Sequence, residues 1–344
     1  MPKSRRTAPT TSLRPRARPD DLAERYAPPQ PQIPEQYGKA GPTAGMYDGL
    51  GIEDKTDEFG ELGAKQRRGD PSEVILHQTM SETGASTEGA YENRIKKGSH
   101  TGAHYLIDEE GETSLTVPTD EVVYHAVGHN NDAIGIENVG MPEKVSQRSD
   151  MHQQIEALDL SPKLKARLLA MSERELKQTL SSNGNYIYKD INGPQKRANW
   201  NLLRAISAEH GIELEADVES HEHVQAKTIG EGENIEEFVD AMLHWPKKLD
   251  QLEARIAELE ASGEQPGKVA EMKAELTAQR EQLEAVKLDK SMPENNALEG
   301  ELILGEPGPA SAREETREQF WDDFYPTMQR LDDWLKEPAV EGMV

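Results

Sequence analysis

The sequence predicts an α/β sandwich followed by a helical tail. Between residues 73 and 220, short runs of buried-type residues alternate with helix-like segments. Strands separated by helices are typical of an α/β layer structure. Beyond Trp245, apolar residues take a heptad-like spacing, which indicates helices that pack against one another. With 35% hydrophobic and 30% charged residues among 344, the middle of the chain can build a core, and less ordered segments are expected at its ends.

The strands of the sandwich are predicted from short apolar runs bounded by turn residues. The expected strands are residues 73–77, 103–108, 113–117, 133–139 and 218–220, with a further short run at 186–188. The turn at residues 109–112 joins the second and third strands in a hairpin.

Helices are predicted between these strands. We expect one at residues 86–97 that stops at Gly98, and one or two amphipathic helices within 158–180. A further helix is expected at 194–210, because Pro194 suits a first turn and Gly211 follows the end.

Composition excludes several classes of function. The net charge of −25, from 64 acidic and 39 basic residues, repels phosphate backbones and argues against a nucleic-acid partner. Since the chain has no cysteine, any metal must be held by His, Asp or Glu, and the redox compartment is left open. No apolar run approaches the roughly 18 residues of a membrane span. No secretory signal is recognisable, so we expect synthesis in the cytoplasm and action elsewhere after delivery or lysis.

Two histidines occupy positions that suit metal binding. His77 ends a predicted strand, and His221 follows another. Because ligands gather beyond the carboxyl ends of strands in α/β sheets, the two histidines could share one cleft and one metal ion. A single histidine at a strand end is more often structural, so the inference depends on the pair.

Several segments resemble successive blocks of one known family. They are residues 74–79 (VILHQT), 104–111 (HYLIDEEG), 125–126 (HA), 130–140 and 220–224 (SHEHV). In this order and with these gaps they resemble the zinc amidase and peptidoglycan-recognition-protein family, which includes phage lysozyme-type amidases. The resemblance covers roughly residues 70–240. It implies a mixed, largely parallel central sheet flanked by helices, with a zinc cleft on one face.

The resemblance also implies an activity, the zinc-dependent hydrolysis of the amide bond between N-acetylmuramic acid and L-alanine in peptidoglycan. It makes His77 and His221 zinc ligands, Glu137 the acid that activates water, and Lys227 the cation that stabilises the oxyanion. The implied substrate-binding residues are His125, Asn130 and Tyr105. Zinc polarises carbonyls and activates water, and a carboxylate can move the proton. A buried strand acid without a partner is costly, which favours the functional interpretation of Glu137.

The third zinc ligand departs from the family pattern. In the register that aligns Lys227, the ligand position is Ile229, which cannot bind zinc. Members with a loop two residues longer place an acid ten residues after the second histidine, and here that residue is Glu231. Our hypothesis is that Glu231 completes the site. Further candidates are Glu233 and His223. A centre of two histidines with an extra water, or an inactive recognition domain, remains open.

The chain is therefore divided into six parts. They are a disordered basic, Pro-rich arm (1–45), a connecting segment (46–69), the amidase domain (70–243) with a helical insertion at about 141–192, an antiparallel helical hairpin (244–290), a linker (291–312) and an aromatic amphipathic helix (313–337) with a kink at Pro326. The tail helices are interpreted as self-association or protein-docking elements, with binding to the cell wall as the alternative. The arm is either a solvated tail or a docking or export tag.

Three functions compete at this point. The first is a peptidoglycan amidase, either a phage lysin or an effector delivered by an injection or secretion machine. The second is a catalytically inactive peptidoglycan-binding module, suggested by Ile229. The third is an assembly protein in which the amidase fold is vestigial.

Overall fold

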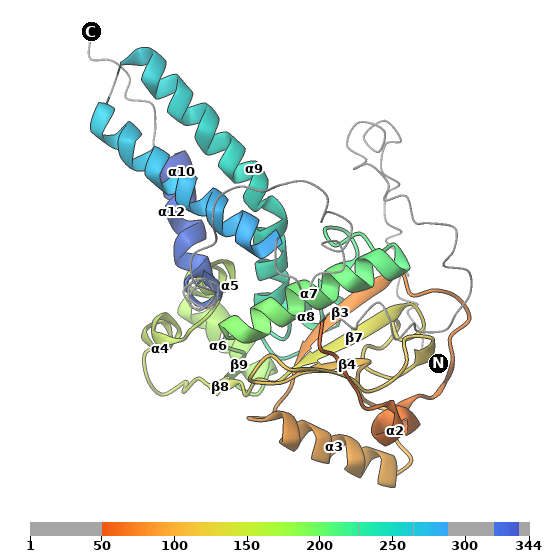
Figure 1. The fold of residues 1–344 in the computed structure, drawn as a ribbon. Coiled ribbons are helices and arrows are strands. Elements are labelled where there is room, and N and C mark those ends of the chain that lie inside the picture. Colours follow the sequence, from red (N-terminus) through yellow and green to blue (C-terminus); the bar gives the residue numbers. More distant parts are fainter. Residues whose placement is uncertain (1–49, 226, 264, 288–319, 337–344) are drawn as a thin grey trace, which may run out of the picture. The chain divides into compact units, whose positions relative to one another are not determined.

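A six-stranded sheet forms the centre of the computed structural model, which describes residues 50–225, 227–263, 265–287 and 320–336 (Figure 1). In sheet order, its strands are β1 (Glu53–Asp54), β5 (Thr113–Leu115), β4 (Tyr105–Ile107), β7 (Ala133–Asn138), β3 (Glu73–Gln78) and β10 (Val218–Ser220). Four of the neighbouring pairs are parallel, and β4 with β5 is antiparallel. The predicted mixed, largely parallel sheet is thus confirmed.

Two further pairs of short strands lie outside this sheet, and of their four strands only one was predicted from the sequence. β2 (Lys65–Gln66) pairs antiparallel with β6 (Glu121–Val122). β8 (Glu143–Lys144) pairs antiparallel with β9 (Tyr186–Ile187), which coincides with the short run expected at 186–188. The expected connecting segment contains β1, α2 (Thr56–Phe59), the 3-10 turn η1 (Gly60–Leu62) and β2.

The register of β3 with β7 separates the two faces of the sheet. His77 lies beside Glu137, and side chains on paired residues of parallel strands point to the same face. The alternate residues, including Leu76 and Ile136, are buried in the main hydrophobic core on the opposite face. One face is therefore apolar, and the other carries the ionisable residues.

Helices cover both faces (Figure 1). α7 (Gly193–His210) packs on the apolar face; it starts at a capping box formed by Asn192 and Gln195 and ends at Gly211, whose φ is 70°. This confirms the helix predicted at 194–210. α3 (Gly84–Lys96), capped by Thr83, lies across the other face.

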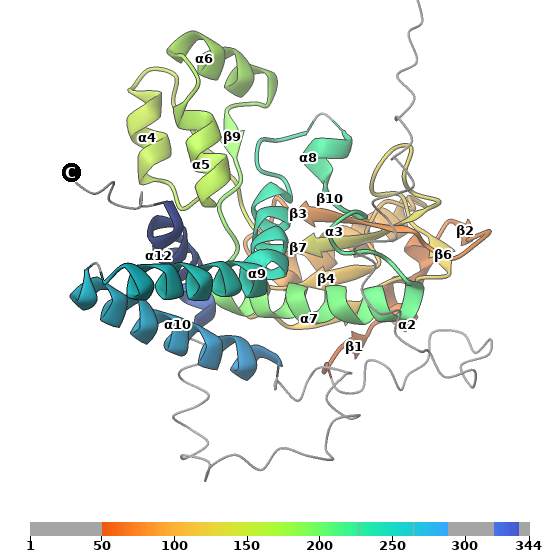
Figure 2. The same cartoon turned by 90° about the horizontal axis from the view of Figure 1, so that it is seen from above.

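The insertion expected at about 141–192 contains three helices, where the sequence suggested one or two. They are α4 (Met151–Ala157), α5 (Pro162–Leu169) and α6 (Glu173–Ser182), which lie together beside α9 in Figure 2. Their apolar side chains form a hydrophobic cluster of their own. The extra helix arises because Asp150 caps a turn ahead of the predicted region.

The first helix of the C-terminal tail, α9, begins inside the region expected to form the α/β domain. After the short α8 (His221–Val224), α9 (Glu233–Ser262) runs across the domain boundary expected at residue 243, with Pro246 inside it. α10 (Pro266–Lys287) follows a turn at Gly263 and packs against α9. The expected arm (1–45) and linker (291–312) lie outside the described residues.

The aromatic helix is buried within the chain. Residues 320–322 are helical, the helix breaks at Asp323, and α12 (Phe324–Lys336) follows. The kink expected at Pro326 is wrong, because this proline lies in the first turn of α12, where it removes no intrahelical hydrogen bond. Trp245 of α9 stacks on Phe320 with ring centroids 5.1 Å apart. None of the described helices is both long and apolar enough to cross a bilayer.

Candidate active site

Three metal-binding side chains converge beside the carboxyl end of β3. The Oε1 atom of Glu231 lies 2.7 Å from Nδ1 of His221 and 3.7 Å from Nδ1 of His77. Potential ligand atoms of all three residues lie within 4.8 Å of one another. The two histidine side chains are 3% and 2% exposed, so both are almost completely shielded from solvent.

Neighbouring elements bring these residues together. β10 pairs with β3 so that Ser220 lies beside Leu76, and the next residues, His221 and His77, stack edge to face with centroids 4.2 Å apart. Glu231 arrives from the loop after α8.

Two glycines position Glu231. Gly230 and Gly232 flank it, and each has a φ of 82°. A Cβ at Gly232 would lie 2.1 Å from the carbonyl oxygen of Leu76, so only glycine permits this approach to β3.

The far nitrogens of both histidines are also held. Nε2 of His77 lies 3.0 Å from Nδ1 of His125, and Nε2 of His221 lies 3.1 Å from Oε1 of Gln225. If a metal replaces the proton on Nδ1, each Nε2–H can donate to its partner, and these contacts would then favour the tautomer that suits a metal ligand. The donor set of two imidazoles and one carboxylate suits zinc with one position left for water.

The shifted pKa values of His77 and Glu231 favour the ionisation states that metal binding requires. Burial lowers the pKa of His77 to about 4, although Glu231 opposes this effect. Burial raises the pKa of Glu231, but hydrogen bonds to His221 and His77 outweigh it and bring the value to about 2. His77 is therefore neutral and Glu231 ionised at neutral pH, as metal ligands must be.

Glu137 and Lys227 lie near this cluster. Burial, reinforced by the charge of Glu231, raises the pKa of Glu137 to about 7, while Arg94 and Lys227 act against the rise. Glu137 shares the sheet face of His77. Lys227 is half-buried, and no ion pair or hydrogen bond of its side chain occurs among the described residues. An acid that titrates near neutrality thus stands close to a cation and to the candidate ligands.

Other predicted site residues take different positions. Tyr105 is 1% exposed in the main core, because its register with Ile136 directs it to the apolar face. The structure therefore does not bring Tyr105 to the metal cluster, and its role in substrate binding stays a prediction. Asn130 is engaged locally, since its Oδ1 accepts hydrogen bonds from the backbone N–H groups of His125 and Ala126, at 2.8 Å each. It shapes the turn that carries His125.

The alternative third ligands are used elsewhere. Nδ1 of His223 lies 2.9 Å from Glu236, and Glu233 pairs with Arg167. Ile229 is 1% exposed within the hydrophobic cluster of the insertion. Among the candidates weighed from sequence, Glu231 is the one that joins the two histidines.

Sequence reasoning missed two residues near the site. Gln225 holds His221 from the second side, and no sequence signal singles out such a glutamine. Tyr188 is 2% exposed, and burial followed by the charges of Glu231 and Glu137 raises its pKa. The Gly-Glu-Gly sequence at 230–232 was a visible turn signal that could have strengthened the choice of Glu231.

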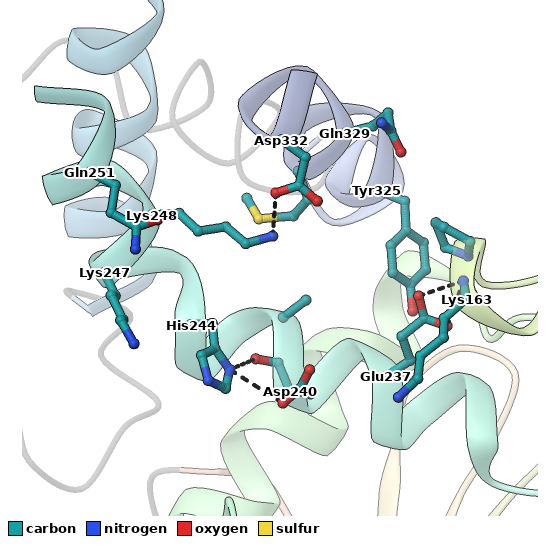
Figure 3. Close-up of a pocket in the computed structure, with 13 residues that line it drawn as sticks. Lys163, Glu237, Asp240, His244, Lys247, Lys248, Gln251, Tyr325, Gln329 and Asp332 are labelled. Carbon is teal, nitrogen blue, oxygen red and sulfur yellow. Dashed lines mark hydrogen bonds and ion pairs between the residues drawn. The ribbon is translucent and has the colours of Figure 1, made fainter. Parts of the chain in front are cut away.

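A separate pocket lies between α5, α9 and α12 (Figure 3). Its charges are largely matched: Nζ of Lys248 lies 2.6 Å from Asp332, and Nδ1 of His244 lies 3.2 Å from Asp240. Glu237 accepts a hydrogen bond of 2.8 Å from the backbone N–H of Lys163 at the start of α5. None of the predicted site residues lines this pocket.

One known family matches the part of the chain that contains this cluster. Residues 67–233 match the family model described as N-acetylmuramoyl-L-alanine amidase. No curated protein matches the chain. This part of the chain is therefore similar to the N-acetylmuramoyl-L-alanine amidase family.

Solved structures of similar proteins include three from different sources. An endolysin of a Thermus scotoductus bacteriophage has 13% identity and a TM-score of 0.34, covering 55% of this chain and 98% of its own. The endolysin amidase LysCS from Clostridium intestinale has 15% identity and a TM-score of 0.32, covering 59% and 99%. Drosophila PGRP-LB has 13% identity and a TM-score of 0.33, covering 54% and 91%.

Proposed function

We propose that this protein is a zinc-dependent amidase that hydrolyses the bond between N-acetylmuramic acid and the L-alanine of the peptidoglycan stem peptide. The observation that carries the proposal is the convergence of His77, His221 and Glu231 within 4.8 Å. The match of residues 67–233 to the amidase family model supports the substrate class.

His77 and His221 would hold zinc through Nδ1, and Glu231 through a carboxylate oxygen. When bound, the metal supplies Lewis acidity toward the amide carbonyl and toward water. His125 and Gln225 orient the two imidazoles through their Nε2 atoms. His125, which is only half-buried, is also proposed to contact substrate.

Glu137 is proposed to move the proton. Its carboxylate accepts a proton as water attacks the carbonyl carbon, and delivers that proton to the nitrogen of L-alanine as the C–N bond breaks. A pKa of about 7 suits both halves of this transfer at neutral pH. Lys227 stabilises the charge that develops on the carbonyl oxygen. The products are the free carboxylate of the lactyl group and the free amine of the peptide.

The test is digestion of purified sacculi by the full chain, with mass analysis of the released fragments. We expect intact stem peptides with free L-alanine amines, loss of release after treatment with a chelator, and recovery with zinc. The Glu137→Gln variant should bind sacculi without releasing peptides, whereas Glu258→Gln, at an exposed position on α9, should match the wild type. If the wild type binds sacculi but releases no peptides, the amidase proposal is wrong and the protein is a peptidoglycan-binding module.

We also propose that the enzyme acts on the cell wall after delivery or lysis, as a phage lysin or an injected effector. Production in a bacterial cytoplasm, with and without a fused export signal, tests this part. Lysis only with the signal is expected. If cells lyse when the protein is made without an export signal and without another lytic protein, it does not need to be delivered to the cell wall.

A further inference from the structure

The helical insertion grips the loop that carries two of the candidate ligands. This ligand loop comprises residues 221–225 and 227–233. Ile229, two residues before Glu231, is 1% exposed and belongs to the hydrophobic cluster of α4, α5 and α6. The position where the resemblance expected a metal ligand is thus occupied by an apolar residue that packs on the insertion.

Backbone contacts fix the same segment. Ile229 forms a parallel bridge with Ile187 of β9, and the N–H of Tyr188 donates a 2.9 Å hydrogen bond to the carbonyl of Ile229. A Cβ on Gly230 would lie 3.0 Å from both Leu164 of α5 and the carbonyl of Tyr188. The loop is therefore in close contact with β9 and α5 immediately before Glu231.

A charged clamp holds both ends of the loop. Nη2 of Arg167, on α5, lies 3.1 Å from Oε1 of Glu222 and also pairs with Glu233. Glu222 follows His221 directly, and its other oxygen accepts the N–H of Gly230. One guanidinium thus ties the start of the loop to its end.

Asn234 adds a further connection just beyond the loop. Its Oδ1 accepts the N–H of Ser161 at 3.0 Å, and its Nδ2 donates to the carbonyl oxygens of Tyr188 and Lys189, at 3.1 Å each. Asn234 is fully buried, so these bonds are shielded from water. The insertion and the start of α9 therefore form one hydrogen-bonded unit.

We propose that the insertion at about 141–192 is the positioning element of the metal site, with Ile229 as its apolar anchor and Arg167 as its clamp. The inference rests on the proposed zinc site for its effect on metal binding. Neither residue contacts the metal. They act by holding Glu231 and His221 at the separation that the ligands require, as surrounding residues commonly do for metal sites.

The first test compares two matched substitutions. Ile229→Ala and Ile155→Ala remove the same atoms from the same cluster, at residues that are 1% and 0% exposed, but only Ile229 belongs to the ligand loop. We expect Ile229→Ala to weaken zinc binding by about 10- to 100-fold in a chelator competition, and Ile155→Ala to change it by less than about threefold. Equal losses in both variants would overturn the proposal, as would an unchanged affinity in Ile229→Ala.

A second readout does not require metal. Hydrogen exchange of the metal-free full chain should become faster in peptides covering the ligand loop in Ile229→Ala, but not in Ile155→Ala. If the wild type binds no zinc, the proposed function fails, while this exchange experiment still decides the positioning role. Unchanged exchange in the loop would contradict the role independently.

Arg167 provides a variant that leaves the apolar cluster intact. Arg167→Met should weaken zinc binding and alter the visible spectrum of the cobalt-substituted protein, which reports ligand geometry, and Arg167→Lys should restore part of both. A merely structural role would lower thermal stability without changing the cobalt spectrum. That outcome would reject the clamp.

Discussion

The Nδ1 atom of His221 lies 2.7 Å from Oε1 of Glu231, ten positions further along the chain. The short helix α8 and the glycines on either side of Glu231 fold the intervening loop back on itself. This contact places a carboxylate between two buried histidines, and the proposed zinc site depends on it.

Replacing Glu231 should therefore remove the metal. Substitution of residues that merely support a metal ligand costs about 10- to 100-fold in affinity, and we expect Glu231→Ala to cost more. Metal content and chelator competition of the purified protein measure this effect. The exposed Glu258→Ala is the control, and an unchanged zinc stoichiometry in Glu231→Ala would show that the ligand is another residue.

Replacing Glu137 with glutamine should stabilise the protein above neutral pH and abolish its amidase activity. Its pKa is raised from 4.5 to about 7, so the folded state holds the proton more tightly, and the metal-free protein loses stability as pH rises across that interval. Glu137→Gln removes this loss. We expect its Tm to exceed that of the wild type at pH 8 but hardly at pH 5, and its amidase activity to be abolished. A Tm difference independent of pH would contradict the buried charge.

Lys227→Met should lower kcat more than it raises KM. Removing one donor to a developing oxyanion typically costs about 100- to 1,000-fold in kcat. The assay is steady-state kinetics on soluble muropeptides, with the exposed Lys247→Met as the matched control. An effect confined to KM would instead assign Lys227 to substrate binding.

His125→Ala should weaken zinc binding by about 10- to 100-fold, since it leaves Nε2 of His77 without its acceptor. His129→Ala, in the same loop but paired with Glu73, controls for damage to the loop. If His125 only lines the cleft, KM will rise while zinc affinity stays constant. The two measurements separate these roles.

Phe324→Ala should destabilise the protein by about 3–5 kcal/mol, the usual cost of truncating a buried aromatic residue. Phe324 is 0% exposed and contacts Phe238 and Trp245 of α9 through edge-to-face packing. Urea unfolding measures the loss. Zinc affinity of the folded protein should be unchanged, because α12 lies outside the metal cluster. A loss below about 1 kcal/mol would mean that α12 does not pack on α9 in solution.

The sequence alone determined the fold class and singled out His77 and His221 as candidate ligands. One strand-like run ends at His77 and another precedes His221. Both can be predicted from the local pattern of hydrophobic residues. The helix at 194–210 was predictable for the same reason, because its capping residues are adjacent in sequence. The resemblance supplied Glu137 and the order of the blocks.

The tertiary structure decided which residues meet. The sequence favoured Glu231 over Glu233 and His223 on spacing alone, and the left-handed glycines that turn the loop toward β3 are what bring Glu231 to the two histidines. The sequence did not show which face of the sheet carries Tyr105, because one step along a strand exchanges the two faces and the register with Ile136 is a long-range property. The same holds for the insertion, since its grip on Ile229 depends on contacts between segments far apart in the chain. The local pattern of hydrophobic and capping residues determines the helices and strands. Long-range packing determines the distances between the side chains of the candidate site.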